Sequence, residues 1–577
     1  MTPSTYPPDS LRAHLAHEPR AAGFGTSGRR GEVVHLTQLE IYICALGELE
    51  YLQSLPVADG GIVPGEEFFY AYDLRPSSSA YVGNNPRRGE LAQAVEAAIR
   101  AAGMSPVNLG RIPTPALTCY ALAQGKGSMM ITGSHIPFDR NGYKTNTSRG
   151  ELLKQHEAPV NAQVQTVRER LYAEPYASSP FDADGLFKTG QRELAPENPA
   201  AALAYVRRSV DFFGAGALAG VRLLAYQHSA VGRDIVVDIL RGLGAEVFPA
   251  GRSETFVPID TENIDAAQLA TLQALHDAAV AAHGPVDAVV STDGDSDRPL
   301  ILGVDSGAVR FFGGDLVGMI AAEYLGADAV VVPISCNDAI DRGPLRTLLE
   351  PKTRIGSPFV IAGMEAARAQ GKHAVCGWEA NGGFLTGSDI MKQGRMLAAL
   401  PTRDAVLPIV AVLVAAKERG LPLTALFGLL PQRYSRAALL KDFPRPVSLR
   451  ILARFTPENP AIRALVFAQE ALSALDENQR AVALTAAETS ACAALRAELA
   501  EYFGAAAGFG AITALNYVDG VRVYFANGDV AHLRPSGNAD ELRIYAVADT
   551  QARADAIAAW AVAEPDGVLR RLERLVG

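Results

Sequence analysis

Short apolar runs alternate with amphipathic stretches along most of the chain. The apolar runs are rich in β-branched and aromatic residues and have the length of strands; they lie at residues 68–72, 129–132, 221–226, 288–291, 329–334 and 374–377. Between them, apolar residues recur at helical spacing at residues 91–102, 235–247 and 267–282. This alternation predicts α/β units with a largely parallel sheet.

The last part of the chain has a different pattern. Residues 458–500 are Ala-rich and polar, which predicts helix, and residues 511–547 read as antiparallel strands with turns at Asp519-Gly520 and Asn527-Gly528. Composition changes near residues 195, 312 and 435 predict domains at 1–195, 196–312, 313–435 and 436–577. The expected architecture is three mixed α/β sandwich domains followed by a smaller α+β domain.

Composition narrows the class of protein. Among 577 residues, 48% are hydrophobic and 20% charged, and the net charge of −10 argues against a general nucleic-acid binder. The five cysteines lie far apart without a C-x-x-C pair, so we expect neither a zinc site nor disulfides. The chain shows neither a signal-peptide pattern nor about 18 consecutive apolar residues, so we expect a cytoplasmic protein without membrane contact.

A serine lies on a tight turn after the strand predicted at 129–132. The segment I-T-G-S-H-I-P-F-D-R-N-G-Y-K presents Ser134, and the turn at Asn141-Gly142 brings Lys144 back toward it. A lysine beside a serine can stabilise charge on transferring oxygens, which favours a nucleophile or phosphoryl carrier. An ordinary polar βα loop is the alternative.

Three carboxylates alternate in T-D-G-D-S-D-R between two apolar runs. Asp293, Asp295 and Asp297 can converge on a hard cation, and their oxygen ligands suit Mg²⁺. The calcium loop of an EF-hand is excluded, because Arg298 and Val304 stand where that loop needs Gly and Glu. A solvated acidic turn is the alternative.

Two further loops offer ligands for sugars and phosphates. C-G-W-E-A-N-G-G-F carries Glu379 and Asn381, an acceptor and an amide suited to paired hydroxyls, although Gly-rich acidic turns are common. R-P-S-G-N-A-D-E-L-R can cradle a phosphate, unless it is a plain turn with surface arginines; its candidate ligands are Arg534, Ser536, Gly537, Asn538 and Arg543.

The N-terminal segment F-G-T-S-G-R-R-G completes a G-x-G-x-x-G pattern from Gly23. No apolar strand precedes it and no helical pattern follows it, so a dinucleotide-binding fold is rejected. A loop that bears hydroxyl groups and arginines and faces an anionic ligand fits better.

Taken in order, these segments resemble the phosphohexomutase superfamily. They are similar to its F-G-T-S-G-x-R-G opening, its phosphoserine loop T-A-S-H, its magnesium loop D-G-D-x-D-R, its sugar loop and its phosphate-binding loop. Residues 72–78 resemble its D-x-R-x-S-S loop, and residues 110–115 its G-x-x-x-T-P element.

The resemblance implies a heart-shaped, four-domain enzyme with one loop of each domain in a central cleft. Ser134 would carry the phosphoryl group, contact the metal and act with His135 in the phosphoserine loop, and the three aspartates would hold Mg²⁺. Arg30 and Lys144 would serve as catalytic cations or acid/base groups, and Arg298 would orient the phosphoserine or the substrate. The implied reaction interconverts hexose 1-phosphate and hexose 6-phosphate through a 1,6-bisphosphate that also activates the enzyme, in a monomer or homodimer.

The sugar loop departs from the family's bacterial E-M-S-G-H form. Asn381 replaces Ser and Gly383 stands in place of His, which leaves the sugar open. Mannose is favoured, with glucose, pentose and amino-sugar phosphates as alternatives. An inactive sugar-bisphosphate sensor and a metal-dependent phosphatase are the readings outside the mutases.

Overall fold

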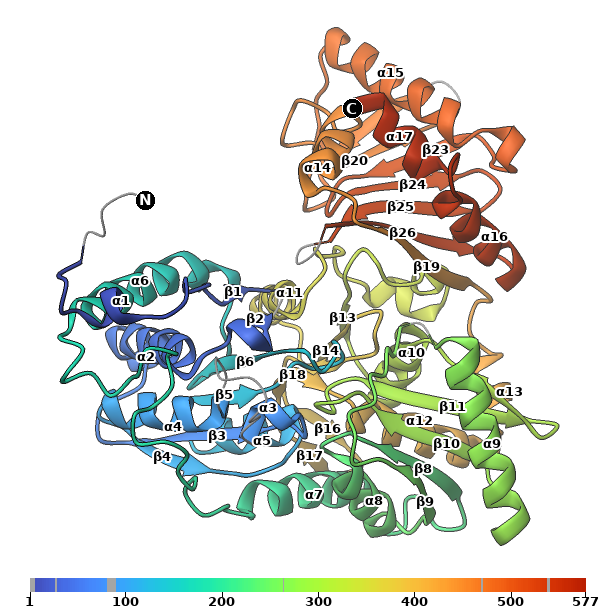
Figure 1. The fold of residues 1–577 in the computed structure, drawn as a ribbon. Coiled ribbons are helices and arrows are strands. Elements are labelled where there is room, and N and C mark those ends of the chain that lie inside the picture. The colour runs from blue at the N-terminus through green and yellow to red at the C-terminus, as the bar shows by residue number, and fades with distance from the viewer. Residues whose placement is uncertain (1–5, 26–27, 80–89, 263, 469–470, 537–539) are drawn as a thin grey trace. The chain divides into compact units, whose positions relative to one another are not determined.

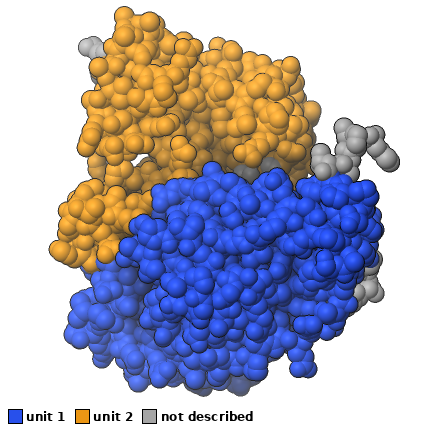
Figure 2. All heavy atoms as spheres, turned by 90° about the vertical axis from the view of Figure 1, so that its left-hand side faces the viewer, with its two compact units in different colours: residues 1–326, 381–425 blue, residues 327–380, 426–577 orange. Residues whose placement is uncertain are grey.

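The computed structural model describes residues 6–25, 28–79, 90–262, 264–468, 471–536 and 540–577 (Figure 1). The chain divides into two compact units, coloured separately in Figure 2. Unit 1 comprises residues 1–326 and 381–425, and unit 2 comprises residues 327–380 and 426–577. Each unit therefore consists of two stretches of chain.

The N-terminal sheet of unit 1 has the strand order β1-β2-β6-β5-β3-β4, with β7 paired to β6. β3 pairs in parallel with β4 and β5, whereas β6 runs antiparallel to both β5 and β2. The strands are β1 (Gly23–Phe24), β2 (Arg29–Glu32), β3 (Glu67–Tyr72), β4 (Ser105–Asn108), β5 (Ser128–Ile131), β6 (Arg140–Thr147) and β7 (Gly150–Glu151).

β3 is buried on both faces, and its alternating side chains serve two helical layers. Phe68 and Tyr70 belong to the hydrophobic core formed with α2 and α4, while the Phe69 ring meets Tyr120 of α5 edge to face at 5.4 Å. The helices around this sheet are α1 (Leu11–His14), α2 (Gln38–Ser54), α3 (Pro76–Ser79), α4 (Leu91–Ala101), α5 (Thr114–Ala123) and α6 (Glu157–Ala173).

The second sheet of unit 1 has the order β12-β11-β10-β8-β9. β8 pairs in parallel with β9 and β10, and β11 is antiparallel to β10 and β12. Its strands are β8 (Arg222–His228), β9 (Glu246–Arg252), β10 (Ala288–Thr292), β11 (Pro299–Asp305) and β12 (Ala308–Phe311). The associated helices are α7 (Ala200–Phe213), α8 (Arg233–Gly242) and α9 (Ala266–His283).

Two sequence predictions for these sheets are wrong in part. Both sheets are mixed rather than largely parallel, because β6 and β11 return as hairpin partners of β5 and β10. The helix predicted over 235–247 ends at Gly242, and residues 246–252 form strand β9. Gly244 adopts a φ of 92° at this junction, a conformation that ends a helix readily.

The remainder of unit 1 carries shorter pairs of strands. β15 (Phe384–Thr386) pairs with β18 (Leu400–Asp404), and β16 (Ile390–Lys392) forms a hairpin with β17 (Arg395–Leu397). α10 (Gly314–Leu325) packs against α12 (Val406–Arg419), and α5 packs against α7 and β18. The short α13 (Leu423–Phe427) contains the passage of the chain from unit 1 to unit 2.

In unit 2, β13 (Ala329–Val331) and β14 (Val375–Trp378) pair in parallel, and α11 (Ser357–Ala369) packs on both. A larger antiparallel sheet has the order β19-β26-β25-β24-β23-β20-β21-β22. Its strands are β19 (Tyr434–Lys441), β20 (Ala464–Phe467), β21 (Leu472–Leu475), β22 (Ala481–Val482), β23 (Ile512–Asn516), β24 (Val521–Phe525), β25 (Val530–Pro535) and β26 (Glu541–Ala548). Its helices are α14 (Arg445–Arg454), α15 (Ala486–Tyr502), α16 (Gln551–Val562) and α17 (Val568–Val576).

The antiparallel run predicted over 511–547 is confirmed by β23 to β26, with both predicted turns in place. The helix predicted over 458–500 is wrong in its first half, which forms β20, β21 and β22 before α15 begins. Pairing of β20 with β23 draws this segment into the sheet, a tertiary effect that outweighs its Ala-rich composition. Among the described residues, none of the helices combines the length and apolar character needed to cross a bilayer.

Candidate functional site

The loop after β5 holds Ser134 in a left-handed backbone conformation with a φ of 55°. Its amide donates to Thr132 Oγ1 at 2.7 Å, and Thr132 Oγ1 donates to Asp73 Oδ2 at 2.8 Å. A non-glycine residue at this φ is strained unless its surroundings hold it. The loop is therefore built to present Ser134 at one fixed point.

The buried guanidinium of Arg75 supplies most of that support. It donates to Asp73 Oδ2 at 3.1 Å and to four loop carbonyls, those of Ser134, Ile136, Pro137 and Arg140. A Cβ on Gly133 would lie 2.6 Å from Arg75 Cζ, so only glycine leaves room for this arrangement. Arg75 and Gly133 together fix the loop's shape.

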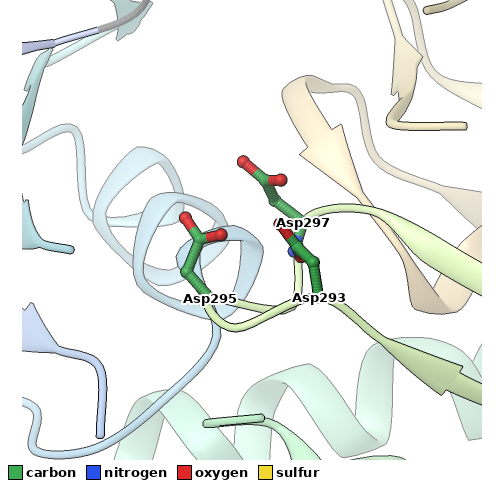
Figure 3. Close-up of side chains that lie close together, drawn as sticks. All are labelled: Asp293, Asp295 and Asp297. Atoms are coloured by element: carbon green, nitrogen blue, oxygen red, sulfur yellow. The ribbon is translucent and has the colours of Figure 1, made fainter. Parts of the chain in front are cut away.

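The loop between β10 and β11 carries the three aspartates predicted to bind metal (Figure 3). Asp293, Asp295 and Asp297 are buried, and one carboxylate oxygen of each lies within 4.8 Å of the others. Asp293 Oδ1 accepts the backbone N–H groups of Asp297 and Arg298, each at 3.1 Å, which closes the loop into a tight turn. Ser134 Oγ donates to Asp293 Oδ2 at 3.0 Å, so the serine and the acidic loop meet within unit 1.

The donor set of this loop fits a hard divalent cation such as Mg²⁺. Asp295 Oδ1 and Asp297 Oδ1 are buried and accept no hydrogen bond from the described residues. Buried carboxylate oxygens without a partner are costly, and oxygen ligands are those that Mg²⁺ prefers. Asp293, Asp295 and Asp297 are the residues that would hold the ion.

Cationic and hydroxyl groups surround the acidic loop. Lys144 Nζ donates to Asp295 Oδ2 at 2.8 Å and to Asp297 Oδ2 at 2.6 Å. Thr114 Oγ1, at the start of α5, also donates to Asp295 Oδ2 at 2.8 Å. Arg403 on β18 donates to Asp297 Oδ2 through Nε at 3.0 Å and Nη2 at 2.7 Å.

Because of these contacts, the pKa values of the three carboxyl groups shift in different directions. Burial, and then the neighbouring carboxylates, raise the pKa of Asp293 well above its ordinary value. Burial opposes ionisation of Asp295 and Asp297 too, but Lys144 lowers the pKa of Asp295 and Arg403 lowers the pKa of Asp297. Asp293, the carboxyl that touches Ser134, is therefore the one of the three without a close cationic hydrogen-bond donor among the described residues.

Arg30, His135 and Arg298 complete the part of the site in unit 1. Arg298 Nη1 donates to His135 Nδ1 at 2.9 Å, and this guanidinium together with burial lowers the pKa of His135 well below its ordinary value. His135 is therefore neutral at pH 7. Arg30 Nη1 donates to the carbonyls of Arg29 and Tyr143, at 2.7 and 3.2 Å, and burial lowers the pKa of Arg30 to about 10.

The residues predicted for sugar and phosphate binding are distributed over the two units. Asn381 lies in unit 1, where its carbonyl accepts from Thr261 Oγ1 at 2.9 Å, and buried Glu379 follows β14 in unit 2. Arg534 and Arg543 face each other across β25 and β26 of unit 2. The other predicted ligand described in that loop is Ser536, whose amide donates to the Glu541 carbonyl at 2.9 Å; Gly537 and Asn538 lie outside the described residues.

Sequence reasoning assigned no site role to Arg75, Thr114 or Arg403. Arg75 and Thr114 lie inside segments that the resemblance had singled out, at 72–78 and 110–115, so a signal was present. Arg403 belongs to no such segment. The available hint was the polar triplet T-R-D at the end of a short apolar strand, too common a pattern to indicate a role.

Family models match most of this chain. The model of phosphoglucomutase/phosphomannomutase alpha/beta/alpha domain I matches residues 21–171, that of domain III matches residues 313–434, and that of the C-terminal domain matches residues 481–563.

Two curated relatives are similar over nearly their whole length. A phosphomannomutase of Sinorhizobium fredii is 35% identical over 540 residues, covering 94% of this chain and 98% of its own. A phosphomannomutase of Salmonella muenchen is 34% identical over 537 residues, covering 92% of each chain.

Solved structures show the same fold at lower identity. A phosphoglucomutase/phosphomannomutase family protein from Burkholderia thailandensis has a TM-score of 0.61 at 16% identity, covering 96% of this chain and 97% of its own. The phosphoglucomutase parafusin of Paramecium has a TM-score of 0.54 at 15% identity, covering 92% of each chain.

Proposed function

The chain belongs to the alpha-D-phosphohexomutase superfamily, and on that premise we propose that it interconverts mannose 1-phosphate and mannose 6-phosphate through a phosphoserine at Ser134. The enzyme is an isomerase that transfers a phosphoryl group within one sugar. The observation that carries the proposal is the contact of Ser134 Oγ with Asp293 Oδ2, at 3.0 Å, at the edge of a buried acidic triad. Mannose is supported by the two relatives named phosphomannomutase.

Two transfers make up the proposed reaction. Phosphoserine 134 gives its phosphoryl group to a hydroxyl of the sugar monophosphate, and a 1,6-bisphosphate forms. The bisphosphate then turns over and returns its other phosphoryl group to Ser134 Oγ. Free bisphosphate therefore acts as the activator, since it can phosphorylate a serine that has lost its phosphoryl group.

Positioning and charge are what the residues of this chain contribute. Lys144 can turn from the carboxylates to the transferring phosphoryl oxygens, while Arg30 and Arg298 add fixed positive charge on either side of Ser134. His135 is neutral and accepts a hydrogen bond from Arg298. It therefore helps to hold the loop in place without adding charge to the site. Mg²⁺ bound by Asp293, Asp295 and Asp297, with Ser134 beside it, would supply Lewis-acid stabilisation of the transferring phosphoryl group.

Two sets of residues are proposed for recognition of the sugar and of the distal phosphate. Glu379 and Asn381 are assigned to the sugar hydroxyls, because a carboxylate and an amide can accept from and donate to paired hydroxyls. The distal phosphate is assigned to Arg534, Ser536, Gly537, Asn538 and Arg543. The cross-strand register of Arg534 on β25 with Arg543 on β26 supports this assignment, since two arginines at neighbouring positions can bind one phosphate.

The remaining expectations from the sequence belong to the same proposal. They are the division at 1–195, 196–312, 313–435 and 436–577, a cytoplasmic location, and a monomer or homodimer.

A coupled assay tests the proposed reaction. Mannose 1-phosphate and then glucose 1-phosphate are supplied with Mg²⁺ and the matching 1,6-bisphosphate, and formation of the 6-phosphate is followed. We expect isomerisation that disappears in Ser134→Ala and persists in Ser178→Ala, a serine on the exposed surface. The faster sugar identifies the substrate.

Two outcomes would overturn the proposal. Steady release of inorganic phosphate at the rate of turnover would identify a phosphatase instead. No isomerisation of either hexose would direct the search to pentose and amino-sugar phosphates, and failure with those would favour a sugar-bisphosphate sensor.

A further inference from the structure

Arg403 is a buried cation that holds one carboxylate of the acidic triad. Its exposed fraction is 4%, and its Nε and Nη2 both donate to Asp297 Oδ2, at 3.0 and 2.7 Å. Both donors of the planar guanidinium converge on this one oxygen, so Oδ2 is held against Arg403 and Oδ1 points away from the guanidinium donors. The other oxygen, Asp297 Oδ1, accepts no hydrogen bond from the described residues, and Arg298 Nε lies 3.7 Å from it.

Gly383 is what allows Arg403 to lie in this position. A Cβ at residue 383 would lie 2.4 Å from Cδ, 2.7 Å from Cγ and 3.0 Å from Cβ of Arg403. These atoms form the stem of the side chain near its backbone, so a larger residue at 383 would displace Arg403 as a whole. The contact between Arg403 and Asp297 thus depends on a glycine twenty residues away.

Arg403 and Lys144 both donate to Asp297 Oδ2, but they differ in how easily each can move to another partner. Lys144 Nζ reaches Asp297 Oδ2 at 2.6 Å on a flexible stem, and it also contacts Asp295. Removing one partner from a buried charge pair is strongly destabilising. Because Arg403 remains, Asp297 keeps a cationic partner when Lys144 turns to a phosphoryl oxygen. Asp295 keeps the hydrogen bond from Thr114.

We propose that Arg403 is a positioning residue of the phosphoryl-transfer centre, which aims Asp297 Oδ1 at a divalent cation and is kept in place by Gly383. The inference rests on the proposed function in one respect, namely that the cation serves phosphoryl transfer. Binding of the cation can nevertheless be measured without any sugar phosphate.

The test is Mn²⁺ binding to the full-length chain, measured by electron paramagnetic resonance in the absence of substrate. Arg403→Met and Gly383→Ala are expected to weaken Mn²⁺ binding by about 10-fold to 100-fold, the usual effect of removing a group that orients a metal ligand. Arg403→Lys keeps the charge but loses the fork, so it should weaken binding less than Arg403→Met. Arg395→Met is the matched control, since Arg395 on β17 contacts the backbone carbonyl of Phe213 at 2.6 Å and no residue of the site among the described contacts.

Wild-type or tighter Mn²⁺ binding in both Arg403→Met and Gly383→Ala would overturn the inference, because a merely repulsive cation would give that result. Thermal unfolding of the metal-free variants shows whether each one folds. If Arg403→Met does not fold, Mn²⁺ binding to Arg403→Lys is the measurement that decides. Kinetics should show a raised Mg²⁺ half-saturation and a lowered kcat, with the KM for sugar phosphate changed less than either.

The inference and the proposed function fail separately. If the wild-type chain isomerises neither mannose nor glucose phosphate while the variants lose Mn²⁺ affinity, the role of Arg403 stands and the assigned reaction falls. If the wild-type chain isomerises mannose phosphate while the variants bind Mn²⁺ normally, the assigned reaction stands and the role of Arg403 falls.

Discussion

Ser134 owes its position to the side chains of neighbouring loop and strand residues. Its left-handed φ of 55° is maintained by Thr132 and by the hydrogen bonds of Arg75 to the loop carbonyls. Strain of this kind persists only where the surroundings over-determine the conformation. The position of Ser134, the proposed phosphoryl carrier, is thus set by residues that lie behind it.

Arg75→Lys tests this dependence at a single residue. A lysine keeps the charge but cannot reach Asp73 and four carbonyls at once, so the loop should relax. We expect kcat to fall by about 100-fold, the usual effect of misplacing a reacting group by about 1 Å. Arg149→Lys, at an exposed arginine, should leave kcat unchanged, and unchanged kcat in Arg75→Lys would contradict the assignment.

At the scale of elements, β2 and β6 each place a proposed site cation next to a residue that contacts the same buried glutamate. Arg30 and Lys144 serve the site, whereas their neighbours Arg29 and Thr145 both donate to buried Glu48 of α2. The exposed fractions of the Arg29 and Glu48 side chains are 4% and 1%. Alternation along a strand therefore couples the placement of α2 to the placement of Arg30 and Lys144, the proposed catalytic cations.

A double-mutant cycle measures this coupling. Arg29→Met and Glu48→Met should each lower the free energy of unfolding by about 3–5 kcal/mol, since each leaves one charge buried alone. The double variant should lose clearly less than the sum of the two, because neither charge remains. Urea unfolding provides the measurement.

The exposed pair Arg12 and Glu18 is the matched control for that cycle, with side-chain exposures of 24% and 81%. Its loss should change the unfolding free energy by less than about 1 kcal/mol. Additive effects at Arg29 and Glu48 would show that the two groups do not act as a pair.

On the scale of the whole molecule, the two compact units carry different groups of the proposed site residues. The acidic triad and the residues that contact it lie in unit 1, while Arg534 and Arg543 lie in the antiparallel sheet of unit 2, which has its own hydrophobic core. A ligand of the triad should therefore stabilise one unit selectively.

Hydrogen exchange should reveal this selectivity. Mg²⁺ is expected to slow amide exchange in β10, β11 and the loop between them, and to leave β24 and β25 unchanged. Asp295→Asn should remove the effect, whereas Asp238→Asn on the exposed face of α8 should retain it. Equal protection of both units by Mg²⁺ would contradict the assignment of the metal to the triad.

Unit 2 should have an acid sensitivity of its own. His532 is fully buried and its Nε2 donates to the Asp519 carbonyl; burial, together with nearby Arg522, lowers the pKa of His532 to about 3. The unfolded chain has a histidine pKa of about 6.5, so between pH 6.5 and 3 it binds a proton that the folded state does not. The contribution of His532 to the free energy of unfolding is therefore fully present above pH 6.5, and it decreases as the pH falls through this window.

His532→Gln should be less stable than the wild type at pH 7.5 but should lose less stability between pH 6.5 and 5. Its slope should be smaller by up to about 1.4 kcal/mol per pH unit, the contribution of one proton. Exposed His373→Gln should keep the wild-type slope. The measurement is urea unfolding followed at several pH values, and identical slopes in His532→Gln and wild type would refute the prediction.

Much of this protein was determined by its sequence alone, because the information is local. The α/β class, the turn bearing Ser134, the aspartates at alternate positions and the hairpins of 511–547 follow from spacing and turn chemistry within a few residues. The same short-range order let successive segments be matched to one family. Such features do not depend on how the rest of the chain is folded.

Only the tertiary structure decided what distant segments do together. Arg403 meets Asp297 across 106 residues of sequence, and Gly383 makes room for it. Segment 381–425 returns to unit 1 after the chain has entered unit 2, and residues 464–482 become strands because β23 offers an edge. The physical reason is the same in each case, because a side chain or strand takes its role from partners that only folding brings near.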